Sequence, residues 1–136
     1  MSDLFESINE FSRKVKTEYN NKLSKYDITY AQFLILEKLK INKSLSQKEL
    51  LGILNIKGST LTGIIDILLM KGLVRRIVSN SDKRSRNVVI TEYGVKLLNV
   101  SSDIVENIDK KIMFDLNSND KKILIKSIKN MSDKLQ

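Results

Sequence analysis

The chain has 136 residues, of which 41% are hydrophobic and 29% charged, and its formal net charge is +8. This length suits one domain that buries its own hydrophobic core, and the excess of Lys and Arg favours a polyanionic partner. Cysteine and histidine are both absent. Their absence excludes disulfides, thiol redox switches and Cys- or His-dependent metal sites, and it removes the commonest general base. We therefore expect neither an enzyme nor a cofactor.

Neither a secretion signal nor a membrane span is expected from the sequence. The chain begins Met1-Ser2-Asp3 and lacks the basic start and apolar run of a signal peptide. The longest nearly uncharged stretch, residues 58–70, is interrupted by Asp66 and is too short to cross a bilayer. The expected location is cytoplasmic.

Two helices are predicted before residue 45. Apolar residues at helical spacing predict an amphipathic helix from Leu4 to about Leu23. A second helix is predicted from about Tyr30 to Leu39, where the apolar residues leave little polar face. This second helix is expected to be deeply buried.

A short helix then begins after Leu45. Ser46 and Glu49 stand at capping-box spacing, and Leu45 and Leu50 are placed to form a hydrophobic staple. The helix is predicted to end near Asn55.

The next predicted helix covers roughly residues 57–71, and Gly72 follows it as a stop signal. One stripe of this helix is apolar; it consists of Leu61, Ile64, Ile65, Leu68 and Leu69. Two short helices that meet at a tight turn indicate a helix-turn-helix.

Two β-branched segments, 73–78 and 88–90, flank a polar stretch and predict a β-hairpin. Thr91 is placed to cap a long helix that continues to about Asp115. A terminal helix over about 117–135 follows. The fold class is thus mainly α with a small β-hairpin wing.

A single domain over 1–136 is predicted, with a winged helix-turn-helix over about 29–91. The flanking segments, about 3–24 and 92–136, are predicted to be dimerisation helices. Their apolar faces must be buried against another surface, and a second copy of the chain is the simplest partner that provides one.

The second helix of a helix-turn-helix enters the major groove of double-stranded DNA. With its apolar stripe turned inward, the helix over 57–71 exposes small and hydrogen-bonding residues near its start. These candidate DNA contacts are Lys57, Ser59, Thr60, Thr62 and Gly63. Taken singly, the hydroxyl residues are also ordinary helix-start residues. Asp66 would repel phosphate, so we expect it to pair with Arg75 or Arg76.

The hairpin carries a basic cluster against a single acid, Asp82. Its basic residues are Arg75, Arg76, Lys83, Arg84 and Arg86. Such a tip suits phosphate contact, and an Arg there can enter a narrow minor groove. The alternative is a solvated loop that is polar for solubility.

The run from Ser46 to Gly94 resembles the MarR (multiple antibiotic resistance regulator) family of winged-helix regulators. The matching pieces are Ser46-Gln47-Lys48-Glu49-Leu50, Ser59-Thr60-Leu61-Thr62 with Ile65-Asp66, Lys71-Gly72-Leu73-Val74-Arg75-Arg76, and Ser81-Asp82-Lys83-Arg84 followed by Ile90-Thr91-Glu92-Tyr93-Gly94. Three of these features are specific to the family when they occur in this order and spacing: Gly72-Leu73-Val74 at the start of the first hairpin strand, Asp82-Lys83-Arg84 in the wing, and Ile90-Thr91 with Gly94 at the start of the following helix.

The resemblance implies a homodimer whose first, fifth and last helices interleave and whose two winged helices bind a pseudo-palindrome. It also implies that Arg84 reaches the minor groove and that Asp82 orients the wing. Two positions depart from the family pattern: many members have Arg where this chain has Gly63, and a charged residue where it has Met70.

Members of this family are commonly released from DNA by small anionic or aromatic effectors. Tyr19, Tyr26 and Tyr30 lie in the part of the chain that the resemblance associates with such a ligand, although tyrosines in such helices more often serve packing.

The function expected from these features is a sequence-specific DNA-binding transcriptional regulator, as a rule a repressor in this family. The alternative is a winged-helix scaffold that binds another protein without specific DNA recognition. An enzyme has no support, because the carboxylates are scattered and no nucleophile has an evident base.

Overall fold

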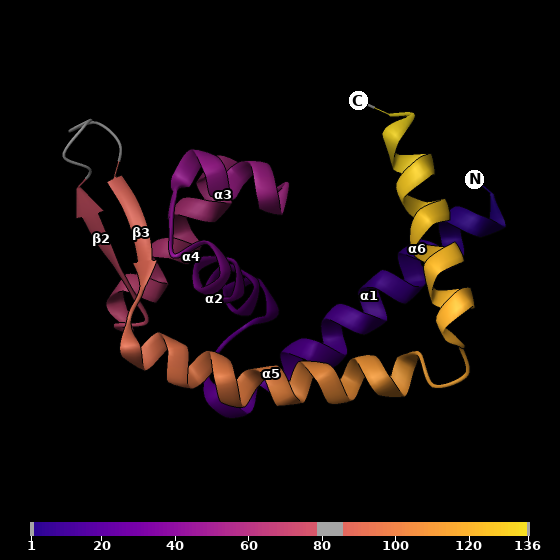
Figure 1. Ribbon diagram of the computed structural model, residues 1–136, viewed down its shortest axis with the longest axis horizontal. Coiled ribbons are helices and arrows are strands. Elements are labelled where there is room, and N and C mark those ends of the chain that lie inside the picture. Colours follow the sequence, from indigo (N-terminus) through magenta and orange to yellow (C-terminus); the bar gives the residue numbers. More distant parts are fainter. Residues whose placement is uncertain (1, 79–85, 136) are drawn as a thin grey trace. The chain divides into compact units, whose positions relative to one another are not determined.

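The structure of the chain, a computed structural model, describes residues 2–78 and 86–135 (Figure 1). They form two compact units, Met1–Ile104 and Val105–Gln136. The first unit contains four α-helices, the sheet and the first part of α5 (Glu92–Ile112), and the second contains the end of α5 and all of α6 (Ser118–Asp133). The predicted boundary of the winged helix at residue 91 stays a prediction.

Helix α1, Asp3–Leu23, begins where the side chain of Ser2 accepts a hydrogen bond from the N–H of Phe5. Only its last turns are buried, at Tyr19 and Leu23. Three large apolar side chains in its N-terminal half are half or more exposed: Leu4, Phe5 and Phe11. This half of the helix therefore has an uncovered apolar surface within its unit.

The helix-turn-helix is formed as the capping signals predict. A 3₁₀ turn, η1 (Ser24–Tyr26), leads to α2 (Tyr30–Asn42), which starts at a capping box that was not predicted, made by Thr29 and Gln32. Helix α3, Gln47–Leu54, starts at the predicted capping box of Ser46 and Glu49 and ends at Asn55, whose φ is 52°. Helix α4, Gly58–Met70, follows after a short turn.

The core of the first unit confirms the deep burial expected for α2. Fully or nearly fully buried side chains come from every helix of the winged helix and from its strands: Phe33, Ile35, Leu36, Leu39, Leu45, Leu50, Leu61, Ile65, Leu68, Leu73, Val74 and Val88. This core holds α4 with one face inward and leaves its opposite face to solvent.

The sheet has three strands, one more than the predicted hairpin. Strands β2 (Val74–Val78) and β3 (Arg86–Ile90) pair antiparallel, as expected, and β1 (Ser44–Ser46) pairs with the other edge of β3. The extra strand places Leu45 opposite Val88, and both side chains are buried. A Ser-Leu-Ser segment carries no strand signal of its own, so only this pairing makes it a strand.

The start of helix α5, Glu92–Ile112, is hydrogen-bonded to the segment that connects α4 to β2. The hydroxyl of Thr91 donates to the carbonyl of Gly72 at 2.7 Å and accepts from the N–H of Gly94 at 3.0 Å. The N–H of Thr91 also donates to the carbonyl of Leu73. The predicted cap is thus confirmed, and it links the helix to the end of α4.

In the second unit, α6 covers Ser118–Asp133, and the side chain of Asn117 caps it by accepting from the N–H of Asp120. None of its described residues is buried. Its exposed large apolar side chains are Ile123, Leu124, Ile125, Ile128 and Met131. As in α1, an apolar surface is left without a cover inside its own unit.

Within residues 2–78 and 86–135, no single helix is long and apolar enough to span a membrane. Helices α3 and α4 reach that length and composition only as a pair bent by 115°. The apolar side chains of this pair include Leu50, Leu61, Ile65 and Leu68, which are part of the core described above.

Candidate nucleic-acid interface

Helix α4 exposes a small polar surface at its N-terminal end. Its N-cap is Lys57, whose side chain makes no capping hydrogen bond, so no N-cap side chain occupies the N–H groups of the first turn. All the residues predicted as DNA contacts on this helix are exposed: Lys57, Ser59, Thr60, Thr62 and Gly63. A phosphate can approach these backbone N–H groups and the neighbouring hydroxyls together.

A chain of side-chain contacts joins α3, α4 and β2 beside this surface. Nε2 of Gln47 donates to Oγ1 of Thr62 at 3.0 Å, and Nη1 of Arg76 donates to Oε1 of Gln47 at 3.3 Å. Nη2 of Arg76 lies 3.9 Å from Oδ1 of Asp66, which confirms the expected pairing for Arg76. Arg76 was predicted to contact DNA, and here its guanidinium holds the wing strand against α4.

Gln47 is a functional candidate that the sequence analysis missed. It follows the N-cap Ser46, and its type and position are unremarkable in a helix that starts with a capping box. Its two partners lie 15 and 29 residues further along the chain. No local pattern predicts such a contact.

The described part of the wing carries Arg75 on the exposed side of β2 and begins β3 at Arg86. Three further wing residues lie outside the described residues: Lys83 and Arg84, which were predicted to bind DNA, and Asp82, which was predicted to orient the wing. Between residues 73 and 90 the sequence has five basic residues and one acidic residue. In the sequence, this basic segment begins shortly after the end of α4.

The two departures from the family pattern both lie on the exposed surface of α4. Apart from its chain neighbours and the backbone of its own helix, no heavy atom lies within 4 Å of the position that a Cβ on Gly63 would occupy, so a larger side chain has room there. The side chain of Met70 is 81% exposed. Met70 is therefore not an extension of the core.

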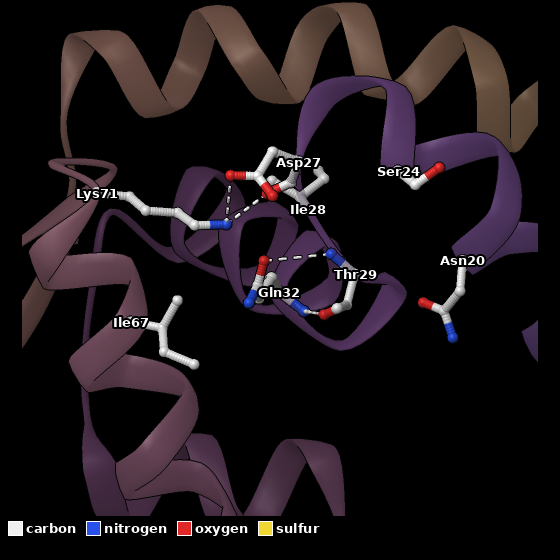
Figure 2. Close-up of a pocket in the computed structure, with 8 residues that line it drawn as sticks. All are labelled: Asn20, Ser24, Asp27, Ile28, Thr29, Gln32, Ile67 and Lys71. Atoms are coloured by element: carbon white, nitrogen blue, oxygen red, sulfur yellow. Dashed lines mark hydrogen bonds and ion pairs between the residues drawn. The ribbon is translucent and has the colours of Figure 1, made fainter.

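A cavity of about 340 Å³ lies between the α1–α2 turn and the C-terminal end of α4 (Figure 2). Its lining residues are Asn20, Ser24, Asp27, Ile28, Thr29, Gln32, Ile67 and Lys71. Nζ of Lys71 donates to the carbonyl of Asp27 and lies 3.5 Å from its carboxylate. This contact ties the turn to the end of α4.

Gln32 supplies the buried polar group of this cavity, with only 6% of its surface exposed. Its Oε1 accepts from the N–H of Thr29 at 3.1 Å, and Figure 2 shows its amide nitrogen turned away from that bond. Nε2 makes no hydrogen bond within the described part of the chain. The cavity therefore offers hydrogen-bond donors from Gln32 and Lys71.

The three tyrosines named as effector candidates do not share one site. Tyr19 and Tyr30 stack with ring centroids 4.2 Å apart and line a second, mainly apolar cavity of about 290 Å³ along α1. Tyr26 lies in η1, where Nζ of Lys25 sits 5.6 Å from its ring centroid, and it lines neither of these cavities.

Comparison with known proteins places these features in a family. The model of the MarR family matches residues 28–85, which include α2, α3, α4 and β2. The multiple antibiotic resistance protein MarR of Salmonella typhimurium is 33% identical over 103 residues, which cover 71% of this chain and 72% of that protein. The chain belongs to the MarR family. It is therefore a transcriptional regulator rather than an enzyme.

Other comparisons extend the match beyond the winged helix. The transcriptional regulator SarZ of Staphylococcus haemolyticus is 26% identical over 88% of this chain and 80% of its own length. A mutant MarR from E. coli, solved in complex with operator DNA, has a TM-score of 0.88 and 26% identity over 95% of this chain and 93% of its own. This MarR-family chain therefore has the winged-helix fold predicted from its sequence.

Proposed function

We propose that this chain is a sequence-specific DNA-binding repressor that acts as a homodimer on a pseudo-palindromic operator. The observation that carries the proposal is the exposed N-terminal face of α4, with Thr62 and Gly63 outward and with Leu61, Ile65 and Leu68 of the apolar stripe fully buried on the opposite face. This face has the size and chemistry of a major-groove binding helix.

The charge of the chain supports DNA as the partner. The net charge is +8, and the basic residues of the wing adjoin the face of α4 in the sequence. Lys and Arg that neutralise phosphates release condensed counterions, which makes binding strongly dependent on salt. A solved relative, the mutant MarR from E. coli, is described as complexed with operator DNA.

The homodimer follows from the apolar surfaces of the terminal helices. Phe5 and Phe11 of α1 are 54% and 55% exposed, and α6 buries none of its described residues within its unit. A second copy of the chain, related by C₂ symmetry, can cover such surfaces. The dimer then presents one α4 helix to each of the two half-sites of an operator. Sedimentation at micromolar concentration should give about twice the 15.6 kDa of one chain; a monomer that binds operator DNA would refute the dimer.

The experiment that tests DNA recognition is a titration of the purified protein against its own upstream DNA and against scrambled DNA of equal length. Contact with about 6–10 phosphates per dimer predicts a log-log salt slope of roughly −5 to −9 and tighter binding of the upstream fragment. Lys57→Gln should flatten the slope by about 2 per dimer. Lys22→Gln, which removes the same charge from α1, is the control and should leave it unchanged.

We further propose that a small anion with an apolar body binds in the cavity of Figure 2 and releases the DNA. Gln32 and Lys71 supply hydrogen-bond donors, whereas Ile28 and Ile67 supply apolar contact. Benzoate and its hydroxylated derivatives are suitable probes, with operator release as the readout. Lys71→Met should abolish the release; an unchanged release in that variant would point to the cavity of Tyr19 and Tyr30 instead.

The alternative is a protein-binding scaffold, which the 81% exposed Met70 at the end of α4 favours. Arg84→Ala separates the two: a DNA-binding regulator loses operator affinity, whereas a scaffold keeps its protein partner. Equal binding of all DNA sequences at physiological salt would contradict the proposed function.

A further inference from the structure

The hydroxyl of Thr62 has two of its three hydrogen-bonding directions assigned by its neighbours. It donates to the carbonyl of Gly58 at 3.0 Å, because a carbonyl can only accept. It accepts from Nε2 of Gln47 at 3.0 Å, because an amide nitrogen can only donate. A hydroxyl has one hydrogen and two lone pairs, so what remains on this exposed side chain is a lone pair.

The direction of the Gln47 amide is itself determined by Arg76. A guanidinium has donors only, and Nη1 of Arg76 meets Oε1 of Gln47 at 3.3 Å. The amide oxygen therefore faces β2 and the amide nitrogen faces α4. Asp66 holds the other end of the guanidinium, with Nη2 3.9 Å from Oδ1. We call the residues Asp66, Arg76, Gln47 and Thr62 the polarity relay.

We propose that the polarity relay makes Thr62 an acceptor-only group, which selects an amino-bearing base in the major groove. This inference rests on the proposed function, because it takes the exposed face of α4 to be the DNA-binding face. Adenine N6 and cytosine N4 are the amino donors at the major-groove edge, whereas guanine and thymine present acceptors there. At the base that Thr62 contacts, each half-site then has adenine or cytosine on the contacted strand.

Guanine or thymine at this position sets an acceptor against the lone pair of Thr62. The loss of one hydrogen bond weakens binding by about five- to tenfold. Gln47 and Arg76 do not meet the base in this scheme. They are positioning residues that hold the hydroxyl in one orientation.

Selection of binding sites from random DNA with the full chain tests the base preference. The wild type should enrich an operator with adenine or cytosine at one defined position of each half-site. Thr62→Val keeps the shape of the side chain without its acceptor and should abolish the preference at that position alone, while Thr62→Ser should retain it. Loss of a guanine or thymine preference in Thr62→Val, or no change at any position, would overturn the proposal. If the wild type enriches no sequence, the proposed function fails as well.

A double-mutant cycle on operator affinity tests the role of Gln47. Gln47→Met should weaken binding by about three- to tenfold in the wild type, because Thr62 is no longer held. In the Thr62→Val background the same change should alter affinity by less than about twofold, because no hydroxyl remains to be oriented. Additive losses would mean that Gln47 acts without Thr62 and would overturn the polarity relay. Urea unfolding of each variant confirms that the fold is retained.

Discussion

Replacement of Gly94 by Ala should destabilise the chain, although Ala is the better helix former. Gly94 lies in the first turn of α5, and an added Cβ would sit 2.2 Å from the carbonyl oxygen of Leu73 and 2.7 Å from Cγ1 of Ile90. Backbone must therefore move to admit a single methyl group. The same carbonyl accepts a hydrogen bond from the N–H of Thr91 at 3.0 Å. Movement of the backbone therefore strains the contact between Leu73, just before β2, and the start of α5.

The magnitude follows from three contributions. Ala instead of Gly in a helix favours folding by about 1 kcal/mol. Overpacking typically costs about 1–3 kcal/mol, and a lost backbone hydrogen bond about 1 kcal/mol more. The net loss for Gly94→Ala is about 2 kcal/mol. With a urea m-value of about 2 kcal/mol/M, the unfolding midpoint should fall by about 1 M.

Gly63→Ala provides the matched control, because Gly63 is also helical and its added Cβ would meet no heavy atom within 4 Å other than those of its chain neighbours and its own helix backbone. This variant should be more stable by about 0.5–1 kcal/mol. Both variants are measured by urea unfolding at one protein concentration, since a dimer makes the midpoint depend on concentration. A Gly94→Ala variant as stable as Gly63→Ala would refute the steric argument.

Three further predictions concern the helix cap, the binding face and one surface charge. Thr91→Val should lower the free energy of unfolding by about 1–2 kcal/mol, because it removes both hydrogen bonds of the α5 cap; an unchanged urea midpoint would contradict this. Gly63→Arg should tighten operator binding and steepen the log-log salt slope by about 2 per dimer, since the open position admits a guanidinium; an unaltered slope would show that the position does not face phosphate. The pKa of the Glu10 carboxyl lies below its ordinary value because Nζ of Lys14 donates a hydrogen bond to it at 3.0 Å, so Lys14→Met should raise that pKa in an NMR titration.

Much of the fold could be predicted because its signals are local. The capping box of Ser46 and Glu49 acts over three residues, and the cap of α5 at Thr91 acts over the same distance. The apolar stripe of α4 likewise repeats within one helix, so its exposed residues, including Thr62 and Gly63, follow from helical spacing alone. The candidate binding face was therefore predictable residue by residue.

Apart from the pairing of Asp66 with Arg76, contacts between distant segments were not predictable. Strand β1 exists because Leu45 pairs with Val88, 43 residues away, and its own sequence carries no strand signal. The effector tyrosines were grouped by their place in the chain, and packing separates Tyr26 from the other two.

The sequence by itself determined where the helices of this chain start and which face of α4 meets solvent, because capping and helical periodicity operate within one turn. Only the tertiary structure decided which hydrogen bonds the side chains on that face make. Gln47, Thr62 and Arg76 come from α3, α4 and β2. Packing of these elements brings the donor Arg76 to the oxygen of the Gln47 amide and the acceptor Thr62 to its nitrogen. Hydrogen bonds between distant segments depend on the relative positions of whole elements, and the buried core sets those positions.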